Sequence, residues 1–341
     1  MTATHMRREI LEIPEAAARL AETSDTTLAR AGETLRELSP RFLTTVARGS
    51  SDHAASFLKY AIELKAGVPV ASLGPSIASI YGARLKLRDS ACIAISQSGK
   101  SPDIVAMTAS AREGGALTIA VTNTPQSPLA DVSDHAIDIL AGLEKSVAAT
   151  KSFVNSALAG LLLLAHWTGD DELLSAIRQL PRHFRQAIDC DWMSIAGALS
   201  PDSSLFILGR GPSVAIANEA ALKFKETCAM HAEAYSAAEV MHGPLALIGP
   251  GFPVVALAAR DASEPSIAEA ADLLAGKQAS VFITSALSKR ARALPHVATG
   301  HPLTDPLALI VSFYCFVEAF ARHQGLDPDQ PPNLRKVTET T

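Results

Sequence analysis

Residues 91–101 are Ala-Cys-Ile-Ala-Ile-Ser-Gln-Ser-Gly-Lys-Ser, and this stretch decides the fold. Its first half, Ala91–Ile95, is the short apolar run expected of a strand buried on both faces. A loop rich in hydroxyl groups, Ser96–Ser101, follows at once, and Pro102 suits the first turn of a helix. A buried strand, a polar loop and a helix together form the repeating unit of parallel α/β sheets.

The same alternation extends on both sides of this stretch. Before it, Arg7–Leu38 has apolar residues at helical spacing and Pro14 can begin a second helix, so an N-terminal helical arm is predicted. Helical patterns separate the predicted strands, which indicates a doubly wound parallel sheet. The further strands predicted for this sheet are Phe42–Ala47, Val68–Leu73, Leu117–Val121 and Ala136–Leu140.

The second half of the chain repeats this organisation. The strand pattern starts again after Asp189–Asp202, and Arg210-Gly-Pro-Ser213 stands in the same context as Arg48-Gly-Ser-Ser51, between an apolar strand and an Ala-rich helix. This match favours an internal duplication. The predicted strands here are Leu205–Leu208, Val254–Ala258 and Ser280–Thr284. We therefore predict a helical arm at 1–38, two α/β domains at 39–188 and 189–325, and a tail at 326–341.

The composition is that of a folded protein without a nucleic-acid partner. Of the 341 residues 48% are hydrophobic and 19% charged, and a formal net charge of −5 gives no basic field. The longest apolar stretches, Ala157–Ala165 and Pro306–Val317, are shorter than the roughly 18 residues that span a bilayer, so we expect core helices and no membrane. Glu9 and Glu12 stand where a secretory signal would be apolar, so a cytoplasmic location is expected.

The four cysteines do not form a recognisable framework. They lack the paired spacing of disulfide-rich domains or zinc ribbons, and all except Cys190 have an apolar neighbour. We expect reduced and mostly buried thiols at Cys92, Cys190, Cys228 and Cys315.

The serine loop, which we define as Ser96–Ser101, is the predicted site for an anion. Ligands of open parallel sheets collect at the carboxyl ends of the strands, where a helix N-terminus offers N–H groups. Hydroxyl and amide donors suit a phosphate monoester, and Gly99 lets the backbone approach it. An ordinary serine-rich turn that caps the helix explains the same residues, and the pattern of a P-loop is absent. The predicted ligands are Ser96, Gln97, Ser98 and Ser101.

The two halves differ at this position. The corresponding strand end in the second half is Ala258-Ala-Arg-Asp261, which has no cluster of hydroxyl groups. The difference predicts one phosphate site per chain. Ser51, in the loop after the first strand, would close over the same ligand.

The second half has its own concentration of polar groups. Glu219, Lys223 and Glu226 are spaced i, i+4 and i+7, so they share one helix face with a carboxylate beside an amine. Two histidines, two glutamates and a tyrosine follow between His231 and His242, a density that suits proton transfer. A solvated helix face with an intrahelical ion pair is the competing interpretation.

A metal site is a further alternative for this region. Cys228 precedes a His-x-Glu at His231, and Glu239 and His242 form a Glu-x-x-His. The Pro-Cys-x-x-Cys partner of a zinc deaminase is absent, and no second cluster of ligands occurs in the sequence. We therefore expect no metal.

Taken together, these segments resemble the double-domain sugar isomerase (SIS) family, specifically the isomerase half of glutamine-fructose-6-phosphate aminotransferase and the stand-alone SIS-type glucosamine-6-phosphate deaminases. The resemblance covers nearly the whole chain and implies two tandem SIS domains with flavodoxin-like sheets. Each motif alone is weak, whereas their order and spacing together are specific. The motifs are Ser96-Gln-Ser-Gly99, Glu144-Lys-Ser-Val-Ala-Ala-Thr-Lys151, Lys223-Phe-Lys-Glu226 through His231-Ala-Glu-Ala-Tyr235, His242-Gly-Pro-Leu245 and Asp329-Gln-Pro-Pro-Asn-Leu-Arg-Lys336.

The resemblance implies a role for each motif. The serine loop and Ser51 would hold the sugar phosphate, and Val147 and Ala149 would line the pocket. Glu226 would move a proton between C1 and C2 of the sugar. His242 is similar to the family's ring-opening histidine and would act across a subunit interface, which implies a homodimer with shared active sites.

Two lysines complete the implied site. Lys223 looks like the amine that flanks the substrate hydroxyls. Composition alone predicts a frayed end for Asp327–Lys336, which is polar and rich in proline. The resemblance instead makes Lys336 the lysine that can form a Schiff base with the open-chain sugar.

The departures from the aminotransferase pattern favour the deaminase branch. Lys100, Ser101 and Ala149 stand where the aminotransferase typically has Glu, Thr and Ser. Its glutaminase half needs an N-terminal cysteine, and the first cysteine here is Cys92, so glutamine is not expected to supply ammonia.

The expected reaction is hydrolysis of glucosamine 6-phosphate to fructose 6-phosphate and ammonia, without a metal or redox cofactor. Three alternatives stay open: deamination of galactosamine 6-phosphate, deglycation of fructosamine 6-phosphate, and a sugar-phosphate sensor without catalysis. No helix-turn-helix segment is evident in the sequence that would make such a sensor a DNA-binding regulator.

Overall fold

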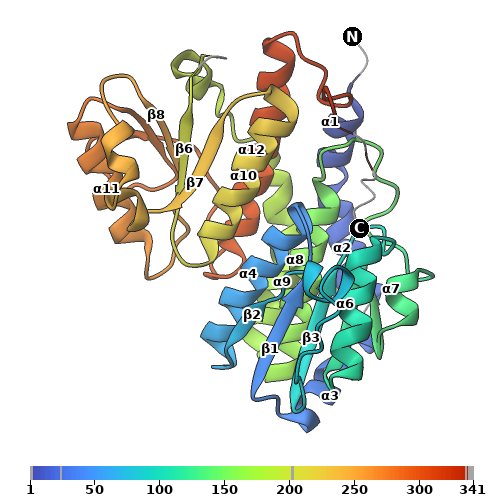
Figure 1. The fold of residues 1–341 in the computed structure, drawn as a ribbon. Helices are drawn as coiled ribbons and strands as arrows, with labels where there is room; N and C mark the ends of the chain where they lie inside the picture. Colours follow the sequence, from blue (N-terminus) through green and yellow to red (C-terminus); the bar gives the residue numbers. More distant parts are fainter. Residues whose placement is uncertain (1–2, 24, 201–202, 335, 337–341) are drawn as a thin grey trace. The chain divides into compact units, whose positions relative to one another are not determined.

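The computed structural model describes the chain except residues 1–2, 24, 201–202, 335 and 337–341. Its contacts divide the described residues into two compact units, each built on one parallel sheet. The first-sheet unit comprises Glu15–Glu144 and Lys151–Arg178. The second-sheet unit comprises the described residues of Met1–Pro14, Lys145–Thr150 and Gln179–Lys336. Figure 1 follows the chain through both sheets.

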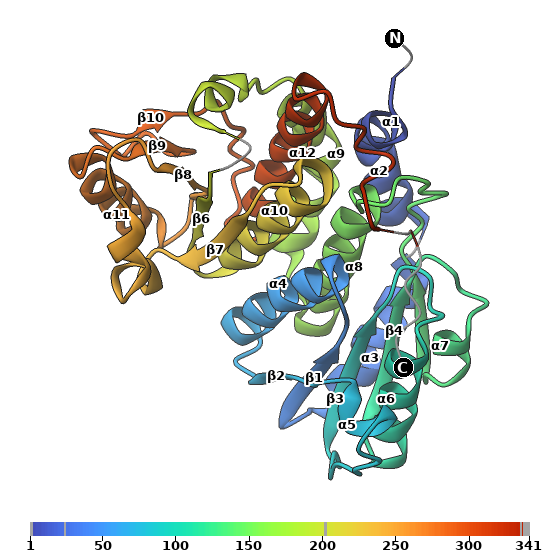
Figure 2. The ribbon, with the colours of Figure 1, turned by 45° about the horizontal axis from the view of Figure 1, so that its top comes forward.

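The first-sheet unit contains a five-stranded sheet in the order β2-β1-β3-β4-β5, with all pairs parallel. Its helices lie on both faces, with α4 and α8 on one side and α6 and α7 on the other (Figure 2). The strands are β1 (Phe42–Val46), β2 (Val70–Ser72), β3 (Ser90–Ile95), β4 (Leu117–Thr122) and β5 (His135–Asp138). The helices are α3 (Asp25–Leu38), α4 (Ser50–Lys65), α5 (Ser76–Ser79), α6 (Pro102–Glu113), α7 (Pro128–Asp131) and α8 (Lys151–Thr168).

The second-sheet unit repeats this topology. Its sheet order is β10-β9-β8-β6-β7, which corresponds to the first order when the strands are counted within the unit. The strands are β6 (Leu205–Gly209), β7 (Ala232–Ser236), β8 (Pro253–Ala256), β9 (Ser280–Ile283) and β10 (Arg292–Ala293). The helices are α1 (His5–Leu11), α10 (Pro212–Cys228), α11 (Glu264–Gly276) and α12 (Asp305–His323), with short 3-10 turns at Met193–Ala198, Glu239–Met241 and Pro244–Leu247. Two more helices, α2 (Ile13–Thr23) and α9 (Asp171–Ile188), each belong partly to both units.

The backbone supports the duplication predicted from the two Arg-Gly tetrads. Gly49 caps α4 with φ 54° and ψ −133°, and Gly211 caps α10 with φ 59° and ψ −136°. A positive φ at the same place after the first strand of each sheet explains why both copies keep glycine there. The predicted two parallel α/β sheets and the helical arm are confirmed.

Two strands were not predicted from the sequence. β7 contains Ala, Glu and Tyr in place of a β-branched run, and it lies at the edge of its sheet with only Ala232 buried. β10 has two residues, both exposed. Edge strands carry a weak hydrophobic signal because one side of each has no neighbouring strand.

The apolar stretches named above form core helices. All residues of α8 from Lys151 to Ala165 are buried. α12 has the length and hydropathy that could cross a membrane, but 83% of that window is buried inside the protein. Such burial is typical of a core helix, in agreement with the prediction, although α12 is longer than the apolar run within it.

Candidate functional site

The serine loop follows β3 at the carboxyl edge of the first sheet and leads into α6. Its backbone is tied to the next strand, because Ser96 N donates to Val121 O (3.1 Å) and Asn123 N donates to Gln97 O (3.1 Å). Leu129 N donates to Gly99 O at 3.1 Å, which joins the loop to α7. The loop is therefore held on both sides before any ligand binds.

Gly99 is required by the geometry of the loop. Its φ of +62° lies in the left-handed region, and a Cβ there would lie 2.2 Å from Ser127 Oγ and 2.6 Å from Ser127 Cβ. Both the conformation and the lack of space exclude a larger residue. The compact turn keeps the N-terminus of α6 directly behind the loop.

The hydroxyls of the loop are not consumed by capping α6. Ser101 is the N-cap residue of α6, yet its side chain makes no capping hydrogen bond. Ser98 Oγ accepts from Lys100 N at 3.3 Å, and Ser96 Oγ accepts from Gly99 N at 3.2 Å. This arrangement differs from the ordinary capping turn that was the alternative interpretation.

An ion pair neutralises the acidic residue behind the loop. Asp103 lies in the first turn of α6 and is fully buried, where its charge would repel a bound phosphate. Arg48, just after β1, donates from Nε to Asp103 Oδ2 at 2.5 Å and also pairs through Nη2. Since β1 lies beside β3 in the sheet, the turn that carries Ser51 in α4 and the serine loop occupy the same edge.

A cavity of about 490 Å³ opens at this edge of the first sheet. It is within the size range of small-molecule sites. Gln97 of the serine loop is in its lining, so loop and cavity are contiguous. The other lining residues are Arg19, Asn123, Thr124, Asp138, Leu140, Gly142, Leu143 and Glu144.

In the second-sheet unit, α10 holds a buried acid–amine–acid group. Lys223 Nζ lies 3.2 Å from Glu219 Oε1 and also donates to Glu226 Oε2, and the side chains of Lys223 and Glu219 are fully buried. Tyr314 OH donates to Glu219 Oε1 at 3.0 Å. The side chain of Glu226 keeps 19% exposure, so it is the carboxylate of the group that a substrate can reach. The solvated helix face is thereby excluded.

The electrostatics of this group keep Lys223 charged. Burial of the ammonium lowers its pKa, but attraction by Glu219 and Glu226 outweighs burial, and the pKa of Lys223 is raised. A raised pKa disfavours the neutral amine, so Lys223 is not suited to act as a base. It can orient Glu226 and donate to an oxygen.

The polar run after α10 does not form one cluster. His231 immediately precedes β7 and Glu233 lies within it. Their side-chain exposures are 60% and 41%, and His231 Nε2 lies 3.8 Å from Glu233 Oε1. Tyr235 OH donates to Glu233 Oε2 at 2.5 Å, as expected of i, i+2 residues on one face of a strand. His242 is exposed on the turn after Met241. Among the described residues, no group of three or more His, Cys, Asp or Glu side chains is placed to hold a metal.

The segment before α8 presents Val147 and Ala149 outward. Ser146, Ala148 and Thr150 are buried, whereas Val147 and Ala149 between them are partly exposed. Residues 145–150 have the contacts of the second-sheet unit, which also contains Lys223, Glu226, His242 and Lys336. The structure thus brings these residues into one unit and the serine loop with Ser51 into the other.

Within the described part of the tail, Asp329 is not part of the frayed end that composition predicts. Asp329 accepts hydrogen bonds from His5 N (2.6 Å) and Met6 N (2.8 Å), so it is joined to the start of α1. Lys336 is partly buried. Sequence reasoning missed both this anchor and the buried carboxylate of Glu9, because partners more than 100 positions apart leave no local pattern.

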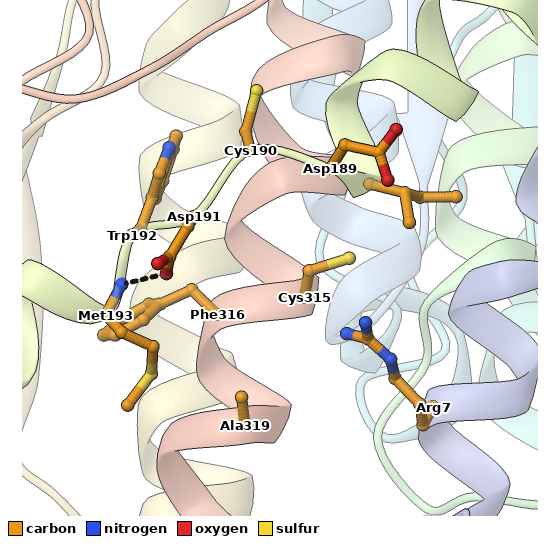
Figure 3. A pocket seen from close by; sticks show the side chains of 10 residues that line it. Arg7, Asp189, Cys190, Asp191, Trp192, Met193, Cys315, Phe316 and Ala319 are labelled. Atoms are coloured by element: carbon orange, nitrogen blue, oxygen red, sulfur yellow. Dashed lines mark hydrogen bonds between the residues drawn. The ribbon is translucent and has the colours of Figure 1, made fainter.

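A small pocket beside α12 offers no reactive thiol. It has a volume of about 170 Å³, and Figure 3 shows Cys190 and Cys315 in its lining with Arg7 opposite. Burial raises the pKa of Cys315 to about 11, and burial also raises the pKa of Cys190. All four cysteines are free, and Cys92, Cys228 and Cys315 are buried as predicted.

Comparison with known proteins identifies the family. The SIS domain model matches residues 40–166 and 198–312, which lie on the first and second sheets respectively. The chain belongs to the SIS domain family. The two matched segments correspond to the duplication seen in sequence and topology, and the resemblance to a double SIS chain is confirmed.

A relative with a known name shows which part of a larger protein this chain is homologous to. It is 35% identical over 360 aligned residues to glutamine–fructose-6-phosphate aminotransferase (isomerizing) of Symbiobacterium thermophilum, an alignment covering 97% of this chain and 58% of the relative. The chain thus spans little more than half the length of that relative, and the SIS chain is homologous to its isomerase portion.

Two solved structures share the SIS fold. A crystal structure from Silicibacter pomeroyi DSS-3, described provisionally as a phosphosugar isomerase, is 58% identical with a TM-score of 0.93, covering 96% of this chain and 100% of that one. The C-terminal domain of glucosamine-fructose-6-phosphate aminotransferase from Francisella tularensis is 24% identical with a TM-score of 0.82, covering 97% and 99%. The second likeness concerns the fold alone.

Proposed function

We propose that this SIS chain is a glucosamine-6-phosphate deaminase that works in the cytoplasm as a homodimer. The observation that carries the proposal is the group on α10, where a buried Lys223 ammonium holds the partly exposed Glu226 carboxylate. A fixed carboxylate that substrate can reach is what proton transfer between neighbouring carbons needs. The serine loop supplies donors for the phosphate of the same substrate.

The phosphate would bind first and orient the sugar. The hydroxyls of Ser96, Ser98, Ser101 and Ser51 and the amide of Gln97 would donate to its oxygens, and the N-terminus of α6 favours the negative charge. Val147 and Ala149 would line the sugar pocket. Binding energy at the phosphate end then helps to hold the reacting carbons near the base.

The proton transfer follows from this placement. His242, supplied across the subunit interface, assists opening of the sugar ring. Glu226 removes the proton from C2 of the open-chain aldose, giving an enolamine, and the proton is returned to C1, giving an imine at C2. Water adds to that imine and ammonia leaves, so that glucosamine 6-phosphate and water yield fructose 6-phosphate and ammonia. Lys223, whose side chain is fully buried, would orient the Glu226 carboxylate and would not flank the substrate hydroxyls directly as the resemblance implies. Lys336 is the amine able to form a Schiff base with the open-chain sugar.

Three residues around the site favour the deaminase over the aminotransferase. Lys100, Ser101 and Ala149 follow the deaminase form of the two motifs and depart from the aminotransferase form. Deamination of galactosamine 6-phosphate, deglycation of fructosamine 6-phosphate and sensing without catalysis use the same phosphate site, so the test includes them.

The first prediction concerns the base. Purified protein incubated with glucosamine 6-phosphate should release ammonia and fructose 6-phosphate in equal amounts, and Glu226→Gln should lower kcat by about 10³-fold, within the range for a lost general base. Fructose 6-phosphate should still bind to the variant, as measured by titration calorimetry.

The matched control is Glu269→Gln, an exposed glutamate on α11 whose loss should leave kcat unchanged. Full activity of Glu226→Gln would show that Glu226 is not the base that transfers the proton. Product from the galactosamine or fructosamine ester alone would redirect the assignment, and binding of the esters without product would favour the sensor.

A further inference from the structure

Helix α1 carries a buried carboxylate directed at the segment that includes Val147 and Ala149. Glu9 is only 4% exposed and lies far from these residues in the sequence. It accepts from Lys145 N, and it accepts from Ser146 through both N (3.3 Å to each carboxylate oxygen) and Oγ. Hydrogen bonds to a charged acceptor are stronger than neutral ones, and burial excludes water as a competitor.

These bonds fix which side chains of the segment face outward. No helix or strand occurs between Asp138 and Lys151, so the conformation here depends on side-chain contacts. Ser146 Oγ also lies 2.9 Å from Ala148 O, which closes a local turn. With Ser146 held inward by Glu9, the next residue, Val147, is presented outward, and Ala149 follows in the same sense.

The same helix also holds the tail. The amides of His5 and Met6 at its start donate to the two carboxylate oxygens of Asp329, seven positions before Lys336. Thr4 Oγ1 donates to the buried Glu318 of α12 at 2.8 Å, and Arg7 points towards Cys315 of α12 (Figure 3). α1 is therefore itself fixed to the core of the second-sheet unit, so it can act as a rigid support.

We propose that Glu9 is a positioning residue for the sugar-phosphate site, acting through residues 145–150, and that α1 aligns this segment and the Lys336 tail on one support. The choice of ligand rests on the function proposed above. Glu9 does not touch the substrate in this proposal. It sets the surface formed by Val147 and Ala149 against which the sugar lies.

The test combines a double-mutant cycle with amide hydrogen exchange in the full-length protein. Glu9→Gln keeps the size of the side chain but replaces one acceptor oxygen by a donor, and Ser146→Ala removes a donor from the other side. Amide exchange at Lys145 and Ser146 should rise at least tenfold in Glu9→Gln. The KM for glucosamine 6-phosphate should rise about tenfold, with kcat changed less than threefold.

The double variant should be no worse than Glu9→Gln alone, because both changes remove the same interaction. The control is Glu12→Gln, an exposed glutamate just after α1, which should leave KM and exchange unchanged. If Glu9→Gln does not fold, Ser146→Ala alone must still raise KM for the proposal to stand.

The outcomes separate this inference from the proposed function. If wild-type protein releases no ammonia, the proposed function fails, and the dissociation constant of fructose 6-phosphate replaces KM as the readout for Glu9. Unchanged exchange at residues 145–146 would disprove the anchor. Raised exchange with unchanged ligand affinity would show a purely structural role and overturn the proposal. The same conclusion would follow if ligand affinity in every variant, the control included, fell in proportion to the fall in melting temperature.

Discussion

The loop after β3 and the loop after β8 occupy equivalent places in two sheets of the same topology, but their polar groups have different partners. In the serine loop, the Ser101 hydroxyl makes no bond to the helix that it caps. In the loop after β8, Arg260 Nε lies 2.9 Å from Asp305 Oδ2 and Ser263 Oγ donates to Asp261 at 2.6 Å. The hydroxyl of Ser101 is thus left for a ligand, whereas the hydroxyl of Ser263 is used within the protein.

This difference shows that equivalent loops in the two copies of a duplicated fold can have different roles, one in ligand binding and one in structure. Gly49 and Gly211 have nearly the same φ and ψ, and the two sheets have the same topology, so the fold alone does not distinguish a binding loop from a structural one. Hydroxyl groups at the carboxyl edge become a site only when no carboxylate of the chain accepts from them. The substitutions below test whether that distinction is real.

The largest effect is expected in the loop after β8, which we call the second loop. Arg260→Ala removes the cation beside Asp305, which is 1% exposed and keeps hydrogen bonds from the amides of residues 260 and 299. A buried carboxylate that loses its counter-ion costs about 3 kcal/mol in the free energy of unfolding. Urea denaturation measures this loss. The affinity for fructose 6-phosphate should be unchanged. A variant that stays stable but binds the ester weakly would place a ligand at the second loop and break the comparison.

A smaller effect is expected in the serine loop. Ser101→Ala should weaken binding of the sugar phosphate by at least about tenfold, since one hydrogen bond to a charged group contributes about 1.5 kcal/mol or more. The free energy of unfolding should change by less than about 0.5 kcal/mol, because the hydroxyl makes no capping bond to α6.

Ser263→Ala is the matched control in the second loop. Its hydroxyl donates to Asp261, so its loss should leave ligand affinity unchanged. Calorimetric titration with fructose 6-phosphate measures both variants. Equal affinities for Ser101→Ala and the wild type would indicate that the serine loop is an ordinary turn and does not bind the phosphate through Ser101.

The fold and the serine loop could be predicted from sequence because their signals are local. β3 and residues 96–101 are contiguous, and the repeat around Arg48 and Arg210 needs only pattern matching. The spacing of Glu219, Lys223 and Glu226 likewise follows from helix geometry. The structure adds what spacing cannot give, namely that two of the three are fully buried.

Long-range contacts could not be predicted in this way. Glu9 is one of several acidic residues near the start of the chain, and its burial depends on Ser146, which is distant in sequence. The contact of Asp329 with α1 is similar, because a polar, proline-rich segment indicates an exposed end until its partner is known. Such contacts are decided by tertiary packing.

The smallest expected effect is a change in the pH dependence of stability near the loop after β8. His296 lies near the second loop, where burial lowers its pKa, the Leu294 carbonyl raises it, and Arg260 lowers it further against the opposing influence of Asp305 and Glu264. Its folded-state pKa is below the ordinary value, so its contribution to stability is present above about pH 6.5 and is lost as pH falls through that lower value.

Thermal denaturation between pH 7.5 and 5 should therefore show a smaller drop for His296→Gln than for the wild type, with little difference at pH 7.5. His323→Gln, at an exposed position in α12, should follow the wild type. The serine loop has no such group, so the pH dependence of ligand binding there should follow the phosphate's own second ionisation near pH 6. Ligand affinity in His296→Gln should therefore keep the wild-type pH profile, because a change in that profile would link the second loop to the phosphate site.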